Sequence, residues 1–316
     1  MQIAHKARTA RPTAKTPVIQ SVEIRVLFFV LFVDNTYLKF INPTESCDMT
    51  KSVLITGASC GIGLATAGYF HRQGWNVAAS MRQPSKDRSL TERPGLIHPQ
   101  LDVTDPASIQ AAVDSVLQRW GRIDVLINNA GYGLIGAFEA ADDMQIRRQF
   151  EVNVFGLMAV TRAVLPSMRE AGGGTVVNIS SMAGYSCFPY YSLYHAGKWA
   201  VEGFSESLRH ELEPFGIRVK LIEPGVVKTD FHTRSKDSIA LPAYEPRAGR
   251  SLARMEQFYR LGNSAERIAE AIYRASTGTG SRLRYPLGWD ARALYALKHI
   301  APDYLIRKLT RFLCVD

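Results

Sequence analysis

Short apolar runs alternate with longer amphipathic stretches along the chain from residue 51 onward. Six of these runs have the length and composition of buried strands: Lys51–Ile55, Trp75–Ser80, Leu96–Leu101, Asp124–Ile127, Thr175–Ile179 and Ile217–Ile222. Between them the pattern predicts helices at Leu64–Gln73, Pro106 to about Trp120, about Asp143–Glu170 and about 191–213. This alternation predicts an α/β fold with an open parallel sheet, in which ligands bind at the carboxyl ends of the strands.

The last stretch of the chain, Ala291–Leu313, predicts a pair of helices that carry both apolar and basic residues. Such helices can lie on a membrane surface. More commonly they cover a sheet or the mouth of an active site, and we favour this second use.

The first residues of the chain have a different character. Residues 1–20 are basic and precede the apolar run Val26–Val33. This order is typical of targeting segments, but the run is far shorter than the ~20 residues that a membrane-spanning helix needs. We interpret residues 1–48 as an appendage or an over-extended translation start, poorly ordered apart from a strand or helix at 22–33. Residues 49–316 then form the main domain.

Composition narrows the class of protein. The chain has 316 residues, of which 46% are apolar, enough for a sizeable core. Its net charge of +9 would suit nucleic acid or an anionic membrane, but the basic residues are dispersed and no zinc-finger or RNA-binding pattern occurs. A solvated basic surface that favours an anionic small ligand is the better interpretation. The cysteines lie far apart without metal-ligand spacing, which is typical of reduced thiols in a cytosolic protein: Cys47, Cys60, Cys187 and Cys314.

A glycine-rich turn joins the first predicted strand to the first helix: Thr56-Gly57-Ala58-Ser59-Cys60-Gly61-Ile62-Gly63. Its glycines allow a tight turn and let a pyrophosphate approach backbone amides at the start of the helix, where the dipole favours negative charge. The G-x-x-x-G-x-G spacing differs from the plain dinucleotide pattern, and a turn without function is the alternative. The position between strand and helix favours a nucleotide site.

Residues at the ends of the next two strands refine the expected ligand. Arg82 stands where an acid would bind the ribose 2′-hydroxyl of NAD, and an arginine there accommodates a 2′-phosphate instead. NADP is therefore favoured over NAD, with a solvated arginine as the alternative. Asp102 is free to meet an adenine amino group, while Asp105 and Pro106 cap and start the next helix.

Asparagines mark two further positions. Asn128-Asn129-Ala130-Gly131 follows the fourth strand, where amides can join neighbouring strands and line the cleft, although a simple turn also favours these residues. Asn153 lies among apolar residues in the long predicted helix. A buried amide needs a partner, so Asn153 makes a structural hydrogen bond, holds a water, or does both.

Tyr194 and Lys198 lie one turn apart on one face of a predicted helix. A fixed cation beside a phenol favours the phenolate and lowers the pKa from about 10 toward the range of acid-base catalysis. The pair alone is weak evidence for catalysis, since an exposed lysine over a half-buried tyrosine is common in helices. Ser181 follows the fifth strand, and the loop 182–190 can bring its hydroxyl to the same substrate oxygen. The sixth strand runs into residues 223–229 at the same sheet edge.

Taken in order, these motifs resemble the signature of the short-chain dehydrogenase/reductases over about residues 50–230: Thr56-Gly57-x-x-x-Gly61-x-Gly63, Asp102, Asn128-Asn129-Ala130-Gly131, Asn153, Ser181, Tyr194-x-x-x-Lys198 and Pro224-Gly225-x-x-x-Thr229. The resemblance implies a single Rossmann-like, doubly wound domain with a seven-stranded parallel sheet. It implies that Tyr194 exchanges the proton with the substrate oxygen and that Ser181 polarises this oxygen. Lys198 then lowers the tyrosine pKa and binds the nicotinamide ribose, and Asn153 holds a water that links Lys198 to solvent.

The same resemblance, together with Arg82, implies NADP(H) rather than NAD(H) as cofactor. Its expected binding residues are Thr56, Gly57, Ser59, Cys60, Gly61, Ile62, Gly63, Arg82, Asp102, Val103, Asn129, Ala130, Gly131, Tyr194, Lys198, Pro224, Gly225, Val227 and Thr229.

Two stretches resemble the branch of 17β-hydroxysteroid and retinol dehydrogenase-like enzymes, Tyr194–Gly203 and Arg284–Gly288. Position 197 is glycine where the family more often has Ser or Thr, which predicts a slightly softer helix. Substrate specificity is expected in the segments Tyr132–Phe138, Met182–Leu193 and 226–262. Their aromatic residues suit an apolar ketone, aldehyde or secondary alcohol, although core packing explains several equally well: Tyr185, Phe188, Tyr190, Tyr191, Phe231, Tyr244 and Phe258.

The sequence thus predicts an NADP-dependent oxidoreductase that interconverts an apolar or lipid-like carbonyl and its alcohol, with Tyr194 as general acid and base. A non-catalytic NADP-binding regulator of the same fold is the alternative, and the complete Asn-Ser-Tyr-Lys set argues against it. The resemblance further implies a homodimer or homotetramer formed through helices around 143–170 and 191–213, and the dispersed cysteines indicate a cytoplasmic location. A small-molecule substrate is expected, with no nucleic acid partner and with membrane contact not favoured.

Overall fold

The computed structural model describes residues 50–86, 93–229, 236–259 and 261–314. The segment 1–48, with the strand or helix predicted at 22–33, lies outside the described residues, and so does Phe231. Within the described part of the chain, the three cysteines Cys60, Cys187 and Cys314 are free, in keeping with the reduced thiols that the sequence predicts.

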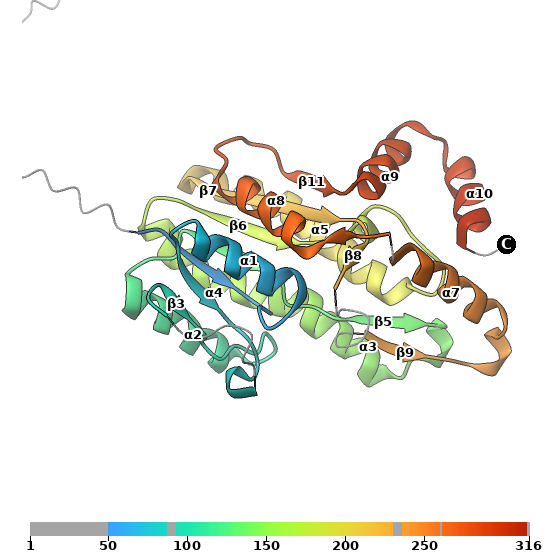
Figure 1. Ribbon diagram of the computed structural model, residues 1–316, viewed down its shortest axis with the longest axis horizontal. Helices are drawn as coiled ribbons and strands as arrows, with labels where there is room; N and C mark the ends of the chain where they lie inside the picture. Colours follow the sequence, from blue (N-terminus) through green and yellow to red (C-terminus); the bar gives the residue numbers. More distant parts are fainter. Residues whose placement is uncertain (1–49, 87–92, 230–235, 260, 315–316) are drawn as a thin grey trace, which may run out of the picture. The chain divides into compact units, whose positions relative to one another are not determined.

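Seven parallel strands form the central sheet, in the order β11-β7-β6-β4-β1-β2-β3 (Figure 1). These strands are β1 (Ser52–Ile55), β2 (Asn76–Ala79), β3 (Leu96–Ile97), β4 (Val125–Asn128), β6 (Gly174–Ile179), β7 (Ile217–Pro224) and β11 (Arg284–Leu287). The predicted α/β fold with a seven-stranded parallel sheet is confirmed. The strand order reverses between β1 and β4, and ligands bind beside the carboxyl ends of strands at such a point.

Helices cover both faces of the sheet, and each face has its own hydrophobic core. Leu54 packs on one face and its neighbours Val53 and Ile55 pack on the other, because successive side chains of a strand point to opposite sides. The helices are α2 (Pro106–Trp120), α4 (Leu157–Glu170) and α5 (Ser192–Leu212) on the first face and α1 (Gly61–Arg72) and α8 (Ala265–Thr277) on the second. Double coverage makes the strands apolar at nearly every position, which is why short apolar runs predicted them.

The ends of α2 follow from its sequence. Oδ1 of Asp105 accepts a hydrogen bond from the Ala107 amide at 2.9 Å, and Pro106 occupies the first helical turn. Gly121 ends the helix in the left-handed conformation with φ 76°, which glycine adopts without the penalty that a side chain brings. The predicted start of this helix at Asp105-Pro106 is confirmed.

The long helix predicted at about Asp143–Glu170 is interrupted. The structure has α3 (Asp143–Phe150), a π-helical segment (Glu151–Gly156) and then α4. Within the π-helical segment, the side chain of Asn153 bonds to the backbone of Tyr132. A Cβ on Gly156 would stand 2.8 Å from Val103. Because these contacts involve distant parts of the chain, helical periodicity alone does not reveal the widened turn, a feature often found at functional sites.

Several short elements lie outside the predicted pattern. Two parallel pairs flank the sheet, β5 (Gly133–Gly136) with β9 (Lys236–Ile239) and β8 (Val227–Lys228) with β10 (Asn263–Ser264). A helix, α7 (Arg247–Tyr259), lies between β9 and β10 in the chain. Short 3₁₀ turns complete the described elements: η1 (Pro84–Lys86), η2 (Phe138–Ala140), η4 (Met182–Gly184), η5 (Glu213–Phe215) and η6 (Pro242–Tyr244).

The C-terminal helix pair is present as α9 (Trp289–Ile300) and α10 (Asp303–Cys314). α10 packs on α7, where Cys314 Sγ lies 4.0 Å from Met255 Sδ and Arg254 donates to the Phe312 carbonyl at 3.3 Å (Figure 1). Met255 also lines the cavity described below, so α10 packs behind one wall of it. That the helix pair covers the mouth of the site stays a prediction. None of the helices in the described part of the chain is long and apolar enough to cross a membrane.

Candidate active site

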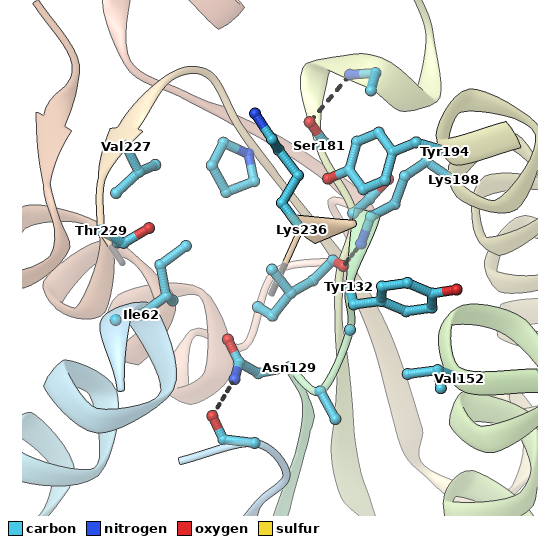
Figure 2. Close-up of a pocket in the computed structure, with 18 of the residues that line it drawn as sticks. Ile62, Asn129, Tyr132, Val152, Ser181, Tyr194, Lys198, Val227, Thr229 and Lys236 are labelled. Carbon is cyan, nitrogen blue, oxygen red and sulfur yellow. Dashed lines mark hydrogen bonds between the residues drawn. The ribbon is translucent and has the colours of Figure 1, made fainter. Parts of the chain in front are cut away.

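A cavity of about 540 Å³ opens at the carboxyl ends of β1, β4, β6 and β7. Figure 2 shows Ile62 and Thr229 on one side of it and Tyr194 and Lys198 on the other. The motifs that the sequence places at successive strand ends therefore line one continuous cavity, as a parallel sheet requires.

The glycine turn forms the first part of the cavity wall, with Ser59, Cys60 and Ile62 lining it at the start of α1. Gly57 and Gly61 have positive φ angles of 65° and 56°, and a Cβ on Gly57 would stand 2.8 Å from Ala130 Cα. The N-cap Cys60 makes no side-chain hydrogen bond to the helix amides. These amides can therefore bind an anion, which the helix dipole also favours.

Thr56 and Gly63, both predicted to bind cofactor, lie behind the cavity wall. The Thr56 hydroxyl accepts hydrogen bonds from the amides of Asn129 and Ala130, each at 3.0 Å. In return, Asn129 Nδ2 donates to the carbonyls of Thr56 and Gly57 at 2.9 Å. A Cβ on Gly63 would collide with Gly57 O and Asn129 Nδ2. Both residues therefore fix the glycine turn against the end of β4 and shape the site without lining it.

Asn128 ties the floor of the site together. Its Nδ2 donates to Thr161 Oγ1 and to Asn178 Oδ1, both at 2.9 Å. Asn178 Nδ2 then donates to Ser205 Oγ at 2.8 Å. The prediction that this amide joins neighbouring strands is confirmed, since the network links β4, β6, α4 and α5.

Arg82 and Asp102 lie beyond the glycine turn, where Val103 also lines the cavity. Arg82 is exposed, so its guanidinium can meet an anion there without first giving up a buried partner. Oδ1 of Asp102 accepts hydrogen bonds from the Thr104 amide at 2.9 Å and from the Thr104 hydroxyl at 2.8 Å. The turn after β3 therefore already orients this carboxylate.

The segment after β7 lies beside the glycine turn, and four of the predicted cofactor residues line the cavity there: Pro224, Gly225, Val227 and Thr229. The amide of Val226 donates to Asp290 Oδ2 at 2.6 Å, and its carbonyl accepts from the Asn263 amide at 2.8 Å. The segment after β7 is thus held by residues from the C-terminal third of the chain.

Ser181, Tyr194 and Lys198 meet at the far end of the cavity (Figure 2). The Ser181 hydroxyl hydrogen-bonds with Tyr194 and accepts from the Ala183 amide at 3.1 Å. Lys198 Nζ lies 5.7 Å from the centre of the Tyr194 ring and donates to the Ile179 carbonyl at 2.8 Å. The phenol, hydroxyl and ammonium that the sequence predicts to act together do lie together.

Burial controls the protonation of this group. It raises the pKa of Tyr194 to about 12, opposed by the Ser181 hydrogen bond. It lowers the pKa of Lys198 to about 8, opposed by the carboxylate of Glu202. The prediction that Lys198 holds the pKa of Tyr194 below that of a free phenol is therefore wrong, because desolvation of the phenolate outweighs the Ser181 hydrogen bond, which lowers this pKa. At neutral pH, Tyr194 is a neutral phenol and Lys198 is charged.

Asn153 lies just outside the cavity and is 3% exposed. Its Oδ1 accepts from the Tyr132 amide at 2.9 Å, and its Nδ2 donates to the Tyr132 carbonyl at 2.6 Å. The structural hydrogen bond is therefore present and ties the π-helical segment to the loop after β4. The bound water that would link Asn153 to Lys198 stays a prediction.

A comparison with known protein families identifies the family of this chain. The family model described as short chain dehydrogenase matches residues 51–239, which include the glycine turn and the residues at the far end of the cavity. The chain belongs to the short-chain dehydrogenase family. The fold, with its cavity at the strand ends, is thus that of an oxidoreductase family.

Individual short-chain dehydrogenases are similar over most of the chain. A 3-ketodihydrosphingosine reductase of Bacteroides thetaiotaomicron is 37% identical, over 82% of this chain and 96% of its own length. The crystal structure of a short-chain dehydrogenase from Streptomyces avermitilis has a TM-score of 0.71 at 37% identity and covers 83% of this chain and 96% of that one. An NADP-bound structure of ElxO has a TM-score of 0.62 at 26% identity and covers 75% and 98%.

A nicotinamide dinucleotide suits this short-chain dehydrogenase. The cradle at Gly57 and Gly61 has no room for side chains, as a closely approaching pyrophosphate requires. Arg82 and Asp102 line one end of the cavity, and Tyr194 and Lys198 line the other. The residues present therefore match both ends of such a cofactor.

His195 is a site residue that the sequence analysis did not single out. Its Nε2 accepts a hydrogen bond from the Phe188 amide at 2.8 Å, so Nδ1, 2.9 Å from the Ala183 carbonyl, is the donor. Burial lowers the pKa of His195 and favours this neutral form. The histidine thus fixes the loop after Ser181 against α5, and its place in the Tyr194–Lys198 motif was the available signal.

Apolar and aromatic side chains from all three expected segments pack with Tyr194 at the far end of the cavity: Ile135, Phe188, Tyr191, Met255 and Tyr259. The charged residues Arg148, Lys236 and Asp237 also line the cavity. Other predicted rim residues lie elsewhere. Tyr185 is buried and donates to the Ala291 carbonyl at 2.8 Å, while Tyr244 is exposed and donates to Glu139 at 2.9 Å.

Proposed function

We propose that this short-chain dehydrogenase is an NADP-dependent carbonyl reductase for apolar, long-chain substrates, with Tyr194 as its general acid. The observation that carries the proposal is the placement of Tyr194, hydrogen-bonded to Ser181, between the nucleotide half of the cavity and the apolar wall. A carbonyl group bound there would meet an acid and a hydrogen-bond donor together.

The protonation states support reduction as the favoured direction. Because the pKa of Tyr194 is raised to about 12, the phenol carries its proton at neutral pH and can donate it to the substrate oxygen. Ser181 can hydrogen-bond to this oxygen and stabilise the negative charge that develops on it. Lys198, charged at neutral pH, favours the phenolate that is left behind. NADPH supplies the hydride when bound, and hydride plus proton convert the carbonyl to an alcohol.

The roles of the remaining residues follow from their places. The amides at the start of α1 would hold the pyrophosphate, and Asp102 would meet the adenine. Arg82, exposed at the adenosine end with no acid beside it at the end of β2, supports NADP over NAD. Asn153 shapes the loop at Tyr132 and would carry the water beside Lys198.

Two observations support an apolar substrate. Five apolar or aromatic side chains that line the cavity pack with Tyr194, and such walls bind apolar ligands through surface burial. The 37% identical relative from Bacteroides thetaiotaomicron is, by its name, a reductase of a sphingoid ketone. A long-chain ketone is therefore the first substrate class to test.

The test is NADPH consumption by the purified full-length chain, followed by absorbance with a panel of carbonyls. The panel contains long-chain ketones, steroid ketones, retinaldehyde and short polar ketones, each with NADPH and with NADH. We expect turnover with NADPH and a long-chain ketone and little with the short polar ones. NADPH binding without turnover of any carbonyl would favour the regulator instead, and a preference for NADH would contradict the role of Arg82.

A further inference from the structure

The two stretches that resemble one branch of the family meet behind Lys198. Glu202 follows Lys198 by one turn of α5, and Arg284 begins β11. Arg284 Nε lies 3.2 Å from Glu202 Oε2 and 3.5 Å from Glu223 Oε1. Its Nη2 lies 2.9 Å from Glu206 Oε2. Residues from α5, β7 and β11 thus place three carboxylates around one guanidinium.

Two of these carboxylates are deeply buried. The side chains of Glu202 and Glu223 are 7% and 0% exposed, whereas that of Glu206 is 57% exposed. Apart from Arg284, the oxygens of Glu202 and Glu223 find no well-oriented hydrogen-bond donor among the described residues. Two ionised carboxylates at this depth are strongly unfavourable beside a single cation. The cluster therefore needs a proton, a second cation, or both.

Protonation of one carboxylate meets part of this need. Burial and the neighbouring Glu202 raise the pKa of Glu223 to about 8, although Arg284 and Arg282 oppose the rise. Burial also raises the pKa of Glu202, and there the Ser180 hydroxyl, Arg284 and Lys198 oppose it. Glu223, which is fully buried and lies farther from Arg284 Nε than Glu202 does, is therefore the carboxylate that retains a proton more readily.

Lys198 is the second cation. Its side chain is buried, and the attraction of Glu202 opposes the loss of its proton. Lys198 and Glu202 both lie against the end of β6. Lys198 Nζ donates a hydrogen bond to the Ile179 carbonyl, and the next residue, Ser180, lies beside Glu202. Both Ser180 Oγ and Glu202 Oε1 stand 2.7 Å from the position that a Cβ on Gly184 would take.

The other titratable groups around the cluster do not replace this pair. Tyr185, from the loop after β6, donates a hydrogen bond to the Ala291 carbonyl, and burial and nearby acids raise its pKa. Asp290 of α9 accepts from the Val226 amide. The positive charge of Arg282 acts on Glu223, whose pKa it lowers. Glu202 is the carboxylate whose attraction reaches Lys198.

We infer that Glu202 is a positioning residue for Lys198: held by Arg284 and set beside Ser180, its carboxylate keeps the buried ammonium charged through the working pH range. Its meaning for catalysis rests on the proposed function, but the charge on Lys198 can be measured without turnover. Arg284 and Glu223 then serve to hold Glu202 in its ionised form at the correct place.

Competitive labelling of the full-length chain with acetic anhydride at a series of pH values gives the pKa of Lys198, when the labelled peptide is quantified by mass spectrometry. The variants are Glu202→Gln and, as matched control, Glu206→Gln, which removes an exposed carboxylate from the same arginine. We expect Glu202→Gln to lower the pKa of Lys198 by about one unit, the low end of what an adjacent opposite charge contributes. Labelling at pH 7 then rises by up to about tenfold, while Glu206→Gln matches the wild type. An unchanged pKa in folded Glu202→Gln overturns the inference.

A second variant covers the case in which Glu202→Gln does not fold. Glu202→Met with Arg284→Met removes the carboxylate together with its cation, an exchange that buried ion pairs tolerate. Loss of Arg284 alone can only favour the charged lysine, so a lowered Lys198 pKa in the double variant identifies Glu202 as the cause. A pKa that is unchanged or raised refutes the inference.

Kinetics separate this inference from the proposed function. In Glu202→Gln the alkaline limb of kcat for carbonyl reduction should move to lower pH by the same amount as the labelling pKa, with NADPH affinity at pH 6 unchanged. A merely structural role would lower the melting temperature and leave the limb in place, which would count against the inference. A wild-type chain that turns over nothing refutes the proposed function and leaves the labelling result to decide the role of Glu202.

Discussion

Tyr194 shows at the scale of one residue how environment selects a role. A phenol in water and the same phenol in this cavity differ because burial penalises the charged form. With a pKa raised to about 12, Tyr194 keeps its proton at neutral pH and can act as an acid, and it can act as a base only as the pH rises. The residue type thus permits both directions of reaction, and the surroundings favour one.

This protonation state predicts opposite pH dependences for the two directions. Carbonyl reduction needs neutral Tyr194 and charged Lys198, so kcat should be level near pH 6 to 7 and fall as the pH passes about 8, the pKa of Lys198. Alcohol oxidation needs the phenolate, whose fraction grows about tenfold per pH unit below the pKa, and should rise over the same range. Steady-state kinetics in both directions measure this, and reduction that quickens with rising pH would contradict it.

Arg82 carries the cofactor preference. An arginine bound to a phosphate gains a charge-assisted hydrogen bond of about 1.5 to 3 kcal/mol, so Arg82→Ala should reduce the ratio of kcat/KM for NADPH over NADH by roughly 10- to 100-fold. Arg72→Ala is the matched control, because Arg72 is also exposed but lies outside the cavity lining. Equal losses for both cofactors in Arg82→Ala would mean that the side chain does not read the 2′-phosphate.

At the scale of an element, α5 carries most of the far end of the site and contains an unfavourable residue. Gly197 is inside the helix, and a Cβ there would make ordinary contacts of 3.7 Å or more. Gly197→Ala should therefore stabilise the protein by about 0.5 to 1 kcal/mol. Gly203→Ala, on the exposed side of the same helix with open space around it, should stabilise by a similar amount. Denaturant unfolding measures both, and destabilisation by Gly197→Ala would show that the site needs the glycine.

His195 makes the attachment of α5 to its loop sensitive to acid. Its folded pKa lies below the ordinary value of 6.5, so its contribution to stability is full above pH 6.5 and is lost as the pH falls toward the folded pKa, because the unfolded chain then binds more protons. Each tenfold difference in proton affinity between the folded and unfolded histidine corresponds to about 1.4 kcal/mol of stability. Melting temperatures from pH 7.5 to 5 should show this decline in the wild type and in His210→Gln, an exposed control on the same helix. A decline that persists undiminished in His195→Gln would assign it to another group.

Elements and site residues were predictable where local pattern decides them. The strands β1, β4, β6 and β7 are apolar at nearly every position because both sheet faces are covered. The seventh strand, β11, has the sequence Arg-Tyr-Pro-Leu, and its Arg284 serves an ion-pair cluster on α5 and β7. The π-helical segment depends on a bond between Asn153 and Tyr132, 21 residues away in the chain. Such features arise from contacts that no local pattern contains.

The site residues, too, were predictable only where local sequence pattern decides them. Glycines, Tyr194, Lys198 and Ser181 were identified because their order and spacing form a motif, and the cavity brings them together. Spacing did not distinguish Thr56 and Gly63, which support the wall, from Ser59 and Ile62, which line it. It also gave the wrong direction for the pKa of Tyr194, because desolvation depends on the packed surroundings of the phenol.

At the scale of the whole molecule, the functional parts lie within one stretch of the chain. The family model begins at residue 51, and the cavity-lining residues in the described part of the chain lie between Gly57 and Tyr259. Because the family model starts at residue 51, we expect a chain that starts at Met49 to bind NADPH with the affinity of the full-length protein and to melt within a few degrees of it. Fluorescence titration and calorimetry test this, and a large loss of NADPH affinity would give residues 1–48 a part in the site.

The central claim is that Tyr194 exchanges the proton in an NADP-dependent reduction, and Tyr194→Phe tests it most directly. The measurement is kcat for the best ketone of the panel, together with the NADPH Kd by fluorescence, with Tyr191→Phe as a control that removes another hydroxyl from the same cavity wall. We predict that Tyr194→Phe keeps NADPH affinity within about threefold and lowers kcat by roughly 10²- to 10⁴-fold, the usual contribution of a positioned acid, while Tyr191→Phe stays active. Substantial turnover by Tyr194→Phe would contradict the account.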